Sequence, residues 1–489
     1  MSRQTPAPQP GHALTRPLDP QLARVIATLR DRAAASLTEL TELGSIPSVS
    51  AQSAHQPDMQ RAADWLAARL RRAGMPRVEL WPTAGHPAVY AEWTAAPGAP
   101  TVLVYGHYDV QPPEPLDRWD TPPFTPTVVG ERLYGRGVSD DKGPMLLTVQ
   151  VLDAFLSALG TLPVNLKLLV EGEEEVGSAH LPELIAARAA DLQADLAISA
   201  DGGMWSADVP SLTVSGRGVA ALEFTVHGPA HDLHSGRHGG AVHNPLHALA
   251  AVIASLHGPD GRVAVSGFYD GVTDLSPAAR EALRALPHND AAYREQTGAP
   301  DLYGEAGYST LERQWHRPTV EVNGLWGGYA GEGSKTVLPA EAHAKLTCRL
   351  VPGQDPAVIL TRLREHLQRH CPPGVRLVIH PEHHAGRAYQ LPEGHPGRLA
   401  ARQVLQDLYG QPVLEVGMGG SIPVLETFQS LLGLETVLFS FAVGDENIHA
   451  PNEFFRIPRL AQGQEGWARL LWTLGQPGVV AGEPEPERA

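Results

Sequence analysis

Apolar residues recur at helical spacing in two segments near the start of the chain, residues 21–43 and 61–73, and a glycine follows each segment. Short β-rich runs then alternate with helical patterns as far as residue 199. This alternation predicts an α/β fold whose central sheet is mostly parallel. The expected strands are 78–81, 88–93, 101–110, 164–172 and 195–199, with helices over 143–160 and 181–192.

The order of the expected elements changes between residues 212 and 385. Strands and helices follow the order β-α-β-β-α-β there, which is typical of a ferredoxin-like layer, and an irregular stretch over 258–317 with one helix interrupts them. Helix and strand patterns then return, ending in a helix over 457–474. The sequence therefore predicts a smaller domain inserted into a larger one. The predicted bounds are 20–211 and 386–478 for the larger domain, 212–385 for the insert, and 1–19 and 479–489 for flexible tails.

Composition and charge restrict the partners of the chain. Its 38 Lys and Arg against 54 Asp and Glu give a net charge of −16, which repels phosphate backbones and acidic membranes. Two cysteines, Cys348 and Cys371, are too few for a disulfide scaffold or a four-cysteine zinc site. No apolar run approaches the ~18 residues that cross a bilayer, and the polar N-terminal stretch lacks the apolar core of a secretory signal. We expect a cytoplasmic protein that binds neither nucleic acid nor membranes.

Potential metal ligands follow the expected strands. His107 and Asp109 end one strand, the run EGEEEVGS ends another, and Asp201 follows a third. Asp140 lies in a glycine-flanked turn before a helix, and His449 follows the last strand. Because ligands bind at the carboxyl ends of parallel strands, we expect these donors to gather at one edge of the sheet. Such nitrogen and oxygen donors are typical of a site that holds two zinc-like ions.

Each motif alone has a simpler interpretation. Adjacent acids at a helix start, such as Asp140 and Asp141, are often capping residues. The run EGEEEVGS would be a solvated turn if it were exposed, and one histidine among 22 is weak evidence. After a buried strand, however, packed carboxylates repel one another unless cations or protons neutralise them. The combination therefore favours metal ions.

The motifs together resemble a known family. The chain is similar, over roughly residues 40–475, to the dinuclear zinc peptidases that include carnosinases, bacterial dipeptidases, aminoacylases, glutamate carboxypeptidases and acyl-diaminopimelate desuccinylases. The motifs that carry the resemblance, in chain order, are YGHYDVQP, GRGVSDDKG, EGEEEVGS, SADGG, DLHSG, CRLVP, GGSIP and IHAPNE.

The resemblance implies a role for each potential ligand. His107 and Asp201 would bind one ion, Glu175 and His449 the other, and Asp140 would bridge the two. Asp109 would orient His107, and Glu174 would be the general base. Glu171 and Glu173 crowd the same motif, so its register could slip, but strand alternation and Gly177 favour Glu174 as the base. Zn²⁺ is the expected ion, with Mn²⁺ or Co²⁺ as alternatives.

The resemblance also assigns the inserted domain. It would be a lid and dimerisation domain, so we expect a homodimer in which His234 reaches the neighbouring subunit's site to stabilise an oxyanion. Arg349 would bind a substrate carboxylate, and Gly420 and Ser421 would line the same pocket. Without the resemblance, a strand-face salt bridge would be the preferred role for Arg349. The peptide bond between Asp140 and Asp141 is expected to be cis.

The resulting hypothesis is a metallo-dipeptidase of the carnosinase-like branch, whose substrate is a small peptide. The long insert, with its segment GGYAGEGSKTVLP, favours a dipeptidase over the alternatives on the same scaffold, an N-acyl-amino-acid deacylase or a metallocarboxypeptidase. The non-enzymatic alternative is a silent dimeric binding protein. The full set of potential ligands, together with Glu174 and Asp109, argues against it, because a silent relative has no physical reason to keep them all.

Overall fold

The computed structural model describes residues 18–380 and 385–480. They form two compact units. Unit 1 comprises the chain up to residue 214 with 391–416 and the chain from 427, and unit 2 comprises 215–390 with 417–426. The domain bounds predicted from the sequence differ most from these units at residues 417–426, which were predicted to belong to the larger domain but lie in unit 2. The expected tails lie outside the described residues except at 18–19 and 479–480.

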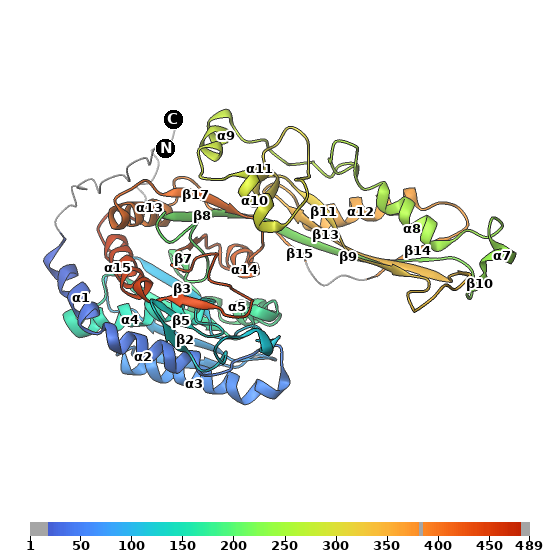
Figure 1. Ribbon diagram of the computed structural model, residues 1–489. Helices are drawn as coiled ribbons and strands as arrows, with labels where there is room; N and C mark the ends of the chain where they lie inside the picture. Colours follow the sequence, from blue (N-terminus) through green and yellow to red (C-terminus); the bar gives the residue numbers. More distant parts are fainter. Residues whose placement is uncertain (1–17, 381–384, 481–489) are drawn as a thin grey trace, which may run out of the picture. The chain divides into compact units, whose positions relative to one another are not determined.

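A six-stranded sheet is the centre of unit 1, with strand order β1-β2-β6-β3-β7-β18. Figure 1 labels β2, β3 and β7 of this sheet. β3 pairs in parallel with both β6 and β7, and β18 pairs in parallel with β7, whereas β1 and β2 run antiparallel. The predicted α/β fold with a mostly parallel sheet is confirmed. The strands are β1 (Arg77–Trp81), β2 (Ala88–Trp93), β3 (Thr101–His107), β6 (Asn165–Glu171), β7 (Leu196–Ser199) and β18 (Thr436–Leu438).

Helices α1, α4 and α15 pack against one another, α13 packs on α15, and α3 packs on β1 and β2. The helix expected over 21–43 is instead two helices separated at Arg32. The apolar periodicity continues across this break because both helices pack on α4. The helices of unit 1 are α1 (Pro20–Asp31), α2 (Ala33–Gly44), α3 (Gln56–Arg72), α4 (Lys142–Leu159), α5 (Leu181–Ala187), α6 (Ala189–Leu192), α13 (Pro396–Tyr409) and α15 (Ile457–Leu474).

Several short elements of unit 1 were not predicted from the sequence. A small antiparallel sheet, β19-β5-β4, joins residues 127–134 to residues 454–456. Its strands are β4 (Thr127–Val129), β5 (Arg132–Tyr134) and β19 (Phe454–Arg456). Three single-turn 3₁₀ helices span Ser53–His55, Leu116–Arg118 and Glu174–Val176. β8 (Ser211–Gly216), β17 (Leu414–Met418) and α14 (Pro423–Leu432) cross the boundary between the units.

Unit 2 contains the predicted β-α-β-β-α-β order in β9, α8, β11, β13, α12 and β14. Its sheet has the order β11-β13-β9-β14 and is antiparallel. Alternate residues of β9 and β13 pack with α8 and α12 into one apolar core that includes Phe224, Leu346 and Leu363. The bounds are β9 (Gly218–His227), α8 (Pro245–Ala254), β11 (Thr319–Gly327), β13 (Glu341–Leu350), α12 (Pro356–His370) and β14 (Arg376–Ile379).

The irregular stretch of unit 2 holds three helices where one was expected. They are α9 (Pro277–Arg284), α10 (Asp290–Thr297) and α11 (Thr310–Trp315). The remaining short elements are β10 (Leu233–His234), α7 (Ser235–His238), β12 (Val337–Leu338), β15 (Ala385–Gly386) and β16 (Tyr389–Gln390). None of the helices in the described ranges is long and apolar enough to span a membrane.

Candidate metal centre

Three neighbouring parallel strands deliver acidic and imidazole groups to one edge of the sheet. His107 is the last residue of β3 and is paired with Glu171, the last residue of β6. Asp201 follows β7, which pairs with the other side of β3. Since these strands are parallel, their carboxyl ends meet at the same edge, as the sequence predicted.

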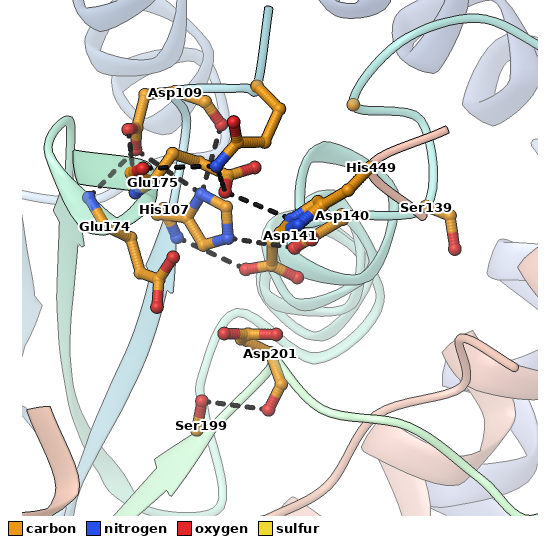
Figure 2. Close-up of polar contacts among 12 residues, drawn as sticks. His107, Asp109, Ser139, Asp140, Asp141, Glu174, Glu175, Ser199, Asp201 and His449 are labelled. Atoms are coloured by element: carbon orange, nitrogen blue, oxygen red, sulfur yellow. Dashed lines mark hydrogen bonds and ion pairs between the residues drawn. The ribbon is translucent and has the colours of Figure 1, made fainter. Parts of the chain in front are cut away.

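Asp140 lies between the imidazoles of His107 and His449 (Figure 2). Its Oδ1 is 3.1 Å from His107 Nε2, and its Oδ2 is 2.9 Å from His449 Nε2. The same His449 nitrogen is 3.1 Å from Glu175 Oε2. The loop before α4 thus places one carboxylate between donors that are more than 300 positions apart in the chain. The bond between Asp140 and Asp141 is cis, which confirms the expectation.

Two groups of side chains are compact enough to hold a metal ion. In each group the ligand atoms all lie within 4.8 Å of one another. Asp140 belongs to both groups and offers an oxygen to each, as a bridging carboxylate must. The groups are His107, Asp140 and Asp201, and Asp140, Glu175 and His449.

Asp109 orients the histidine of the first group. It is fully buried, and its carboxylate Oδ1 lies 3.4 Å from His107 Nδ1, which is also 3.1 Å from the Asp109 carbonyl oxygen. These contacts leave Nε2 of His107 directed at Asp140, as a metal ligand requires. The Asp109 carboxylate also accepts the backbone N–H groups of Glu174 and Glu175, at 3.3 and 3.1 Å. Asp109 therefore fixes both sides of the site.

Burial raises the free energy of the ionised carboxylates in this site, and the pKa values of its residues change accordingly. Burial raises the pKa of Glu174 to about 9 and that of Asp201 to about 6. Hydrogen bonds with Asp140 and Glu175 raise the pKa of His449 to about 10. Burial opposes the charge of Asp140, but hydrogen bonds with His107 and His449 outweigh it and lower the Asp140 pKa. Either bound cations or retained protons must therefore reduce the repulsion between these carboxylates.

The donor set fits divalent cations. Glu175 Oε1 is buried and has no hydrogen-bond partner in the described part of the chain. A buried oxygen without a partner is unfavourable, and a cation between Glu175 and His449 would coordinate it. Imidazole nitrogen and carboxylate oxygen together suit Zn²⁺, Mn²⁺ or Co²⁺.

The contacts of the EGEEEVGS motif separate its four acids. Glu171 accepts hydrogen bonds from Tyr105 Oη at 2.6 Å and Ser178 Oγ at 2.9 Å. Glu173 lies 3.0 Å from His180 Nδ1. The carboxylates of Glu171 and Glu173 therefore have partners other than the two candidate metal-binding groups. Glu175 joins the second donor group, and no hydrogen bond engages the Glu174 carboxylate among the described residues. The role of Glu174 as the base stays a prediction.

The other predicted site residues belong to unit 2. Arg349 Nη1 donates a hydrogen bond to Ser421 Oγ at 3.1 Å, so these two are brought together, and Gly420 adjoins Ser421. His234 ends β10, is exposed, and accepts the Gly236 N–H at its Nδ1 at 3.0 Å. Their roles toward substrate stay predictions.

Sequence reasoning missed Glu453. Its carboxylate is fully buried and accepts four hydrogen bonds from the loop that carries Asp140. The donors are Arg136 Nη1 at 2.8 Å and the backbone N–H groups of Gly137, Ser139 and Asp140 at 2.9, 3.0 and 3.2 Å. Glu453 follows His449 by four residues, so it joins the His449 segment to the Asp140 loop. The only sequence signal was its place in IHAPNE, a motif interpreted for its histidine alone.

Comparison with known proteins assigns the family. Residues 103–473 match the model of peptidase family M20/M25/M40. The chain belongs to this family. A Cys-Gly metallodipeptidase, dug1 of Schizosaccharomyces pombe, is 31% identical over 442 residues, which cover 87% of this chain and 93% of that protein. The resemblance inferred from the motifs, including its carnosinase-like dipeptidase branch, is thereby confirmed. Membership implies a peptidase that uses divalent metal ions.

Solved structures agree with this assignment. The M20 family metallo-carboxypeptidase Sso-CP2 from Sulfolobus solfataricus is similar with a TM-score of 0.79 and 30% identity, over 90% of this chain and 99% of that one. Human carnosine dipeptidase 1 is similar with a TM-score of 0.77 and 26% identity, over 94% of this chain and all of that one.

The contacts of Glu453 predict the effect of changing it. Glu453→Gln would place amide hydrogens against backbone N–H donors, since a carboxylate only accepts whereas an amide nitrogen donates. We expect divalent metal affinity to fall ~10- to 100-fold, as for loss of other groups that orient ligands. Isothermal titration of the metal-free chain with Zn²⁺ measures it. Glu465→Gln, in an acid that pairs with Arg469 on α15, is the matched control. Unchanged affinity in a folded Glu453→Gln chain would contradict this role.

Proposed function

We propose that this protein is a dipeptidase that hydrolyses the amide bond of small peptides with two divalent ions bound at Asp140. The proposal rests on Asp140, which belongs to two donor groups, and on the nearby Glu174, whose carboxylate has no hydrogen-bond partner among the described residues. A pair of ions needs one common ligand, and amide hydrolysis needs a free base. Both requirements are met by residues of unit 1.

The residues divide the chemistry between them. His107 and Asp201 would hold one ion, Glu175 and His449 the other, and Asp140 both. Divalent ions bound there would acidify a water molecule and polarise the substrate carbonyl. Glu174 takes the proton that the water loses and passes it to the departing amine. Burial raises the pKa of Glu174 to about 9, and divalent ions at the neighbouring donor groups would lower it again, so that the carboxylate could accept a proton from water.

The relatives support a dipeptide substrate. Curated proteins similar to this chain are named Cys-Gly metallodipeptidase and Beta-Ala-His dipeptidase, the latter from Homo sapiens at 29% identity over 401 residues. The Sso-CP2 structure, named a metallo-carboxypeptidase, keeps carboxypeptidase activity as the alternative, beside N-acyl-amino-acid deacylase activity. The complete ligand set with Glu174 argues against a silent binding protein, because buried like charges are retained at a cost in stability.

The remaining proposed roles belong to residues of unit 2. Arg349, held by Ser421 beside Gly420, would bind the substrate carboxylate, since Arg349 forms no ion pair within the described ranges. His234 would stabilise the oxyanion in the partner's site, which requires a homodimer through unit 2. Zinc as the resident ion and a cytoplasmic location stay predictions from the sequence.

A substrate panel tests the activity. Dipeptides, tripeptides and N-acyl amino acids would be assayed by amine release with added Zn²⁺, Mn²⁺ or Co²⁺. We expect dipeptides to be cleaved with the highest kcat/KM. Faster cleavage of N-acyl amino acids, or of tripeptides from the carboxyl end, would assign one of the alternatives instead.

Metal removal tests the need for ions. Dialysis against a chelator should abolish hydrolysis, and two equivalents of divalent ion per chain should restore it, because both donor groups must be filled. Elemental analysis during reconstitution gives the stoichiometry. Full activity in chelator, with no stoichiometric metal, would contradict the proposal.

Paired glutamate variants test the assignment of the base. Glu174→Gln should retain the ions and lower turnover by ~10² or more, the cost of losing a positioned base. Glu175→Gln should instead weaken metal binding, because Glu175 belongs to a donor group. Metal titration and kcat are measured on both chains. Opposite phenotypes would show that the two roles are exchanged.

A mixing experiment tests the role of His234. His234→Ala should lower turnover by ~10² to 10³, the usual cost of one oxyanion donor, with metal content unchanged. Mixed with Glu174→Gln chains, it should regain activity, because a heterodimer has one site that carries neither change. Tagged pull-down establishes that subunits exchange. Exchange without recovery, or an active monomer, would overturn the shared site.

A further inference from the structure

Unit 2 contains a cavity of about 420 Å³ whose charges are not balanced. Four of its lining residues are arginines, and only Arg317 among them is paired with a carboxylate within the described residues. Arg317 binds Glu305 with two nitrogens, at 2.7 and 2.8 Å. The other three are Arg217, Arg313 and Arg349. The cavity therefore presents more positive charge than its own acids neutralise.

Arg217 and Arg349 are held by the same loop. Arg217 lies between β8 and β9, and its Nε donates to the Gly419 carbonyl at 3.0 Å. The Ser421 hydroxyl donates to the backbone carbonyl of Arg217 and accepts from Arg349 Nη1. Residues 419–421 thus fix both guanidinium groups without supplying a negative charge. Each guanidinium keeps N–H donors that no described residue accepts, Nη2 of both among them.

The guanidinium groups of Arg217 and Arg349 repel each other, which raises the free energy of their charged forms. Burial, together with the nearby charge of Arg349, lowers the pKa of Arg217 to about 10, and the charge of Glu321 offsets this only in part. Glu321, the other acid lining the cavity, is exposed on β11 and forms no ion pair with either arginine. Half-buried cations that lack a carboxylate partner are costly in a fold unless an anion binds beside them. The arrangement is therefore suited to a ligand with negative charge.

We propose that Arg217 and Arg349 together bind the two carboxylates of an acidic residue at the C-terminus of the substrate. Arg349 takes the α-carboxylate and Arg217 takes the side-chain carboxylate of an aspartate or glutamate. This assignment rests on the proposed function, in which Arg349 binds the substrate carboxylate. Guanidinium groups suit it because each can bind a carboxylate through two parallel N–H donors. The volume is within the range of small-ligand sites.

The matched pair Ala-Glu and Ala-Gln tests this preference, because the two dipeptides have nearly the same shape and differ in one charge. We expect the wild-type kcat/KM to be ~10- to 100-fold higher for Ala-Glu, the range given by a hydrogen bond to a charged group. Arg217→Gln should bring the ratio close to one while Ala-Gln is still cleaved. Arg217→Lys, which keeps the charge but not the planar fork, should retain part of the ratio.

A control variant tests whether any loss of positive charge in unit 2 changes the ratio, or only the loss at Arg217. Arg362→Gln removes one positive charge from α12, where Arg362 pairs with Glu365, and should leave the ratio unchanged. A wild-type ratio of one or below would overturn the proposal. So would an equal loss for both dipeptides in Arg217→Gln, since Arg217 would then only support the 419–421 loop.

Binding measurements distinguish a failure of the proposed dipeptidase activity from a failure of the proposed carboxylate site. If no dipeptide of the substrate panel is cleaved, the proposed function fails, and calorimetry with free L-glutamate and L-glutamine then tests the site itself. If other dipeptides are cleaved but Ala-Glu and Ala-Gln are not, this proposal is overturned while the proposed function stands. Tighter binding of L-glutamate that is lost in Arg217→Gln would support it, and equal or absent binding would overturn it. The same wild-type comparisons decide the question if Arg217→Gln does not fold.

Discussion

The mutual repulsion of carboxylates at one edge of a parallel sheet is the constraint on which the rest of this structure depends. Parallel strands β3, β6 and β7 bring His107, the glutamate motif and Asp201 together whether or not their charges are compatible. Burial raises the pKa of Glu174 and Asp201, so these acids resist ionisation. Divalent cations shared through Asp140 would relieve this cost, so metal binding would also stabilise this edge of the sheet.

The loop that carries Asp140 is held in place by buried carboxylates that do not themselves belong to the two candidate metal-binding groups. Glu453 accepts four hydrogen bonds from residues 136–140, and Glu446 accepts the Ser139 hydroxyl at 2.6 Å. Asp109 similarly fixes His107 and the Glu174 turn. These acceptors come from distant parts of the chain, so the geometry of the site depends on packing throughout unit 1.

The sequence predicted most of the fold because periodicity and strand order are local signals. The α/β sheet, the β-α-β-β-α-β insert and the helix over 457–474 follow from such signals. The break at Arg32, the β4, β5 and β19 sheet and the extra helices of unit 2 do not, because tertiary packing decides them. The candidate ligands could be predicted from the strand ends and the family motifs. Glu453 and Arg217 could not, since their importance lies in long-range contacts that spacing does not report.

The central claim is that Asp140 is shared by two ions. Anomalous diffraction from crystals of the metal-reconstituted protein, recorded on both sides of the metal absorption edge, tests it most directly. If two ions share Asp140, the maps will contain two anomalous peaks per chain about 3.5–4 Å apart, each within coordination distance of a different Asp140 oxygen. A single peak, or two peaks of which only one contacts Asp140, would contradict it.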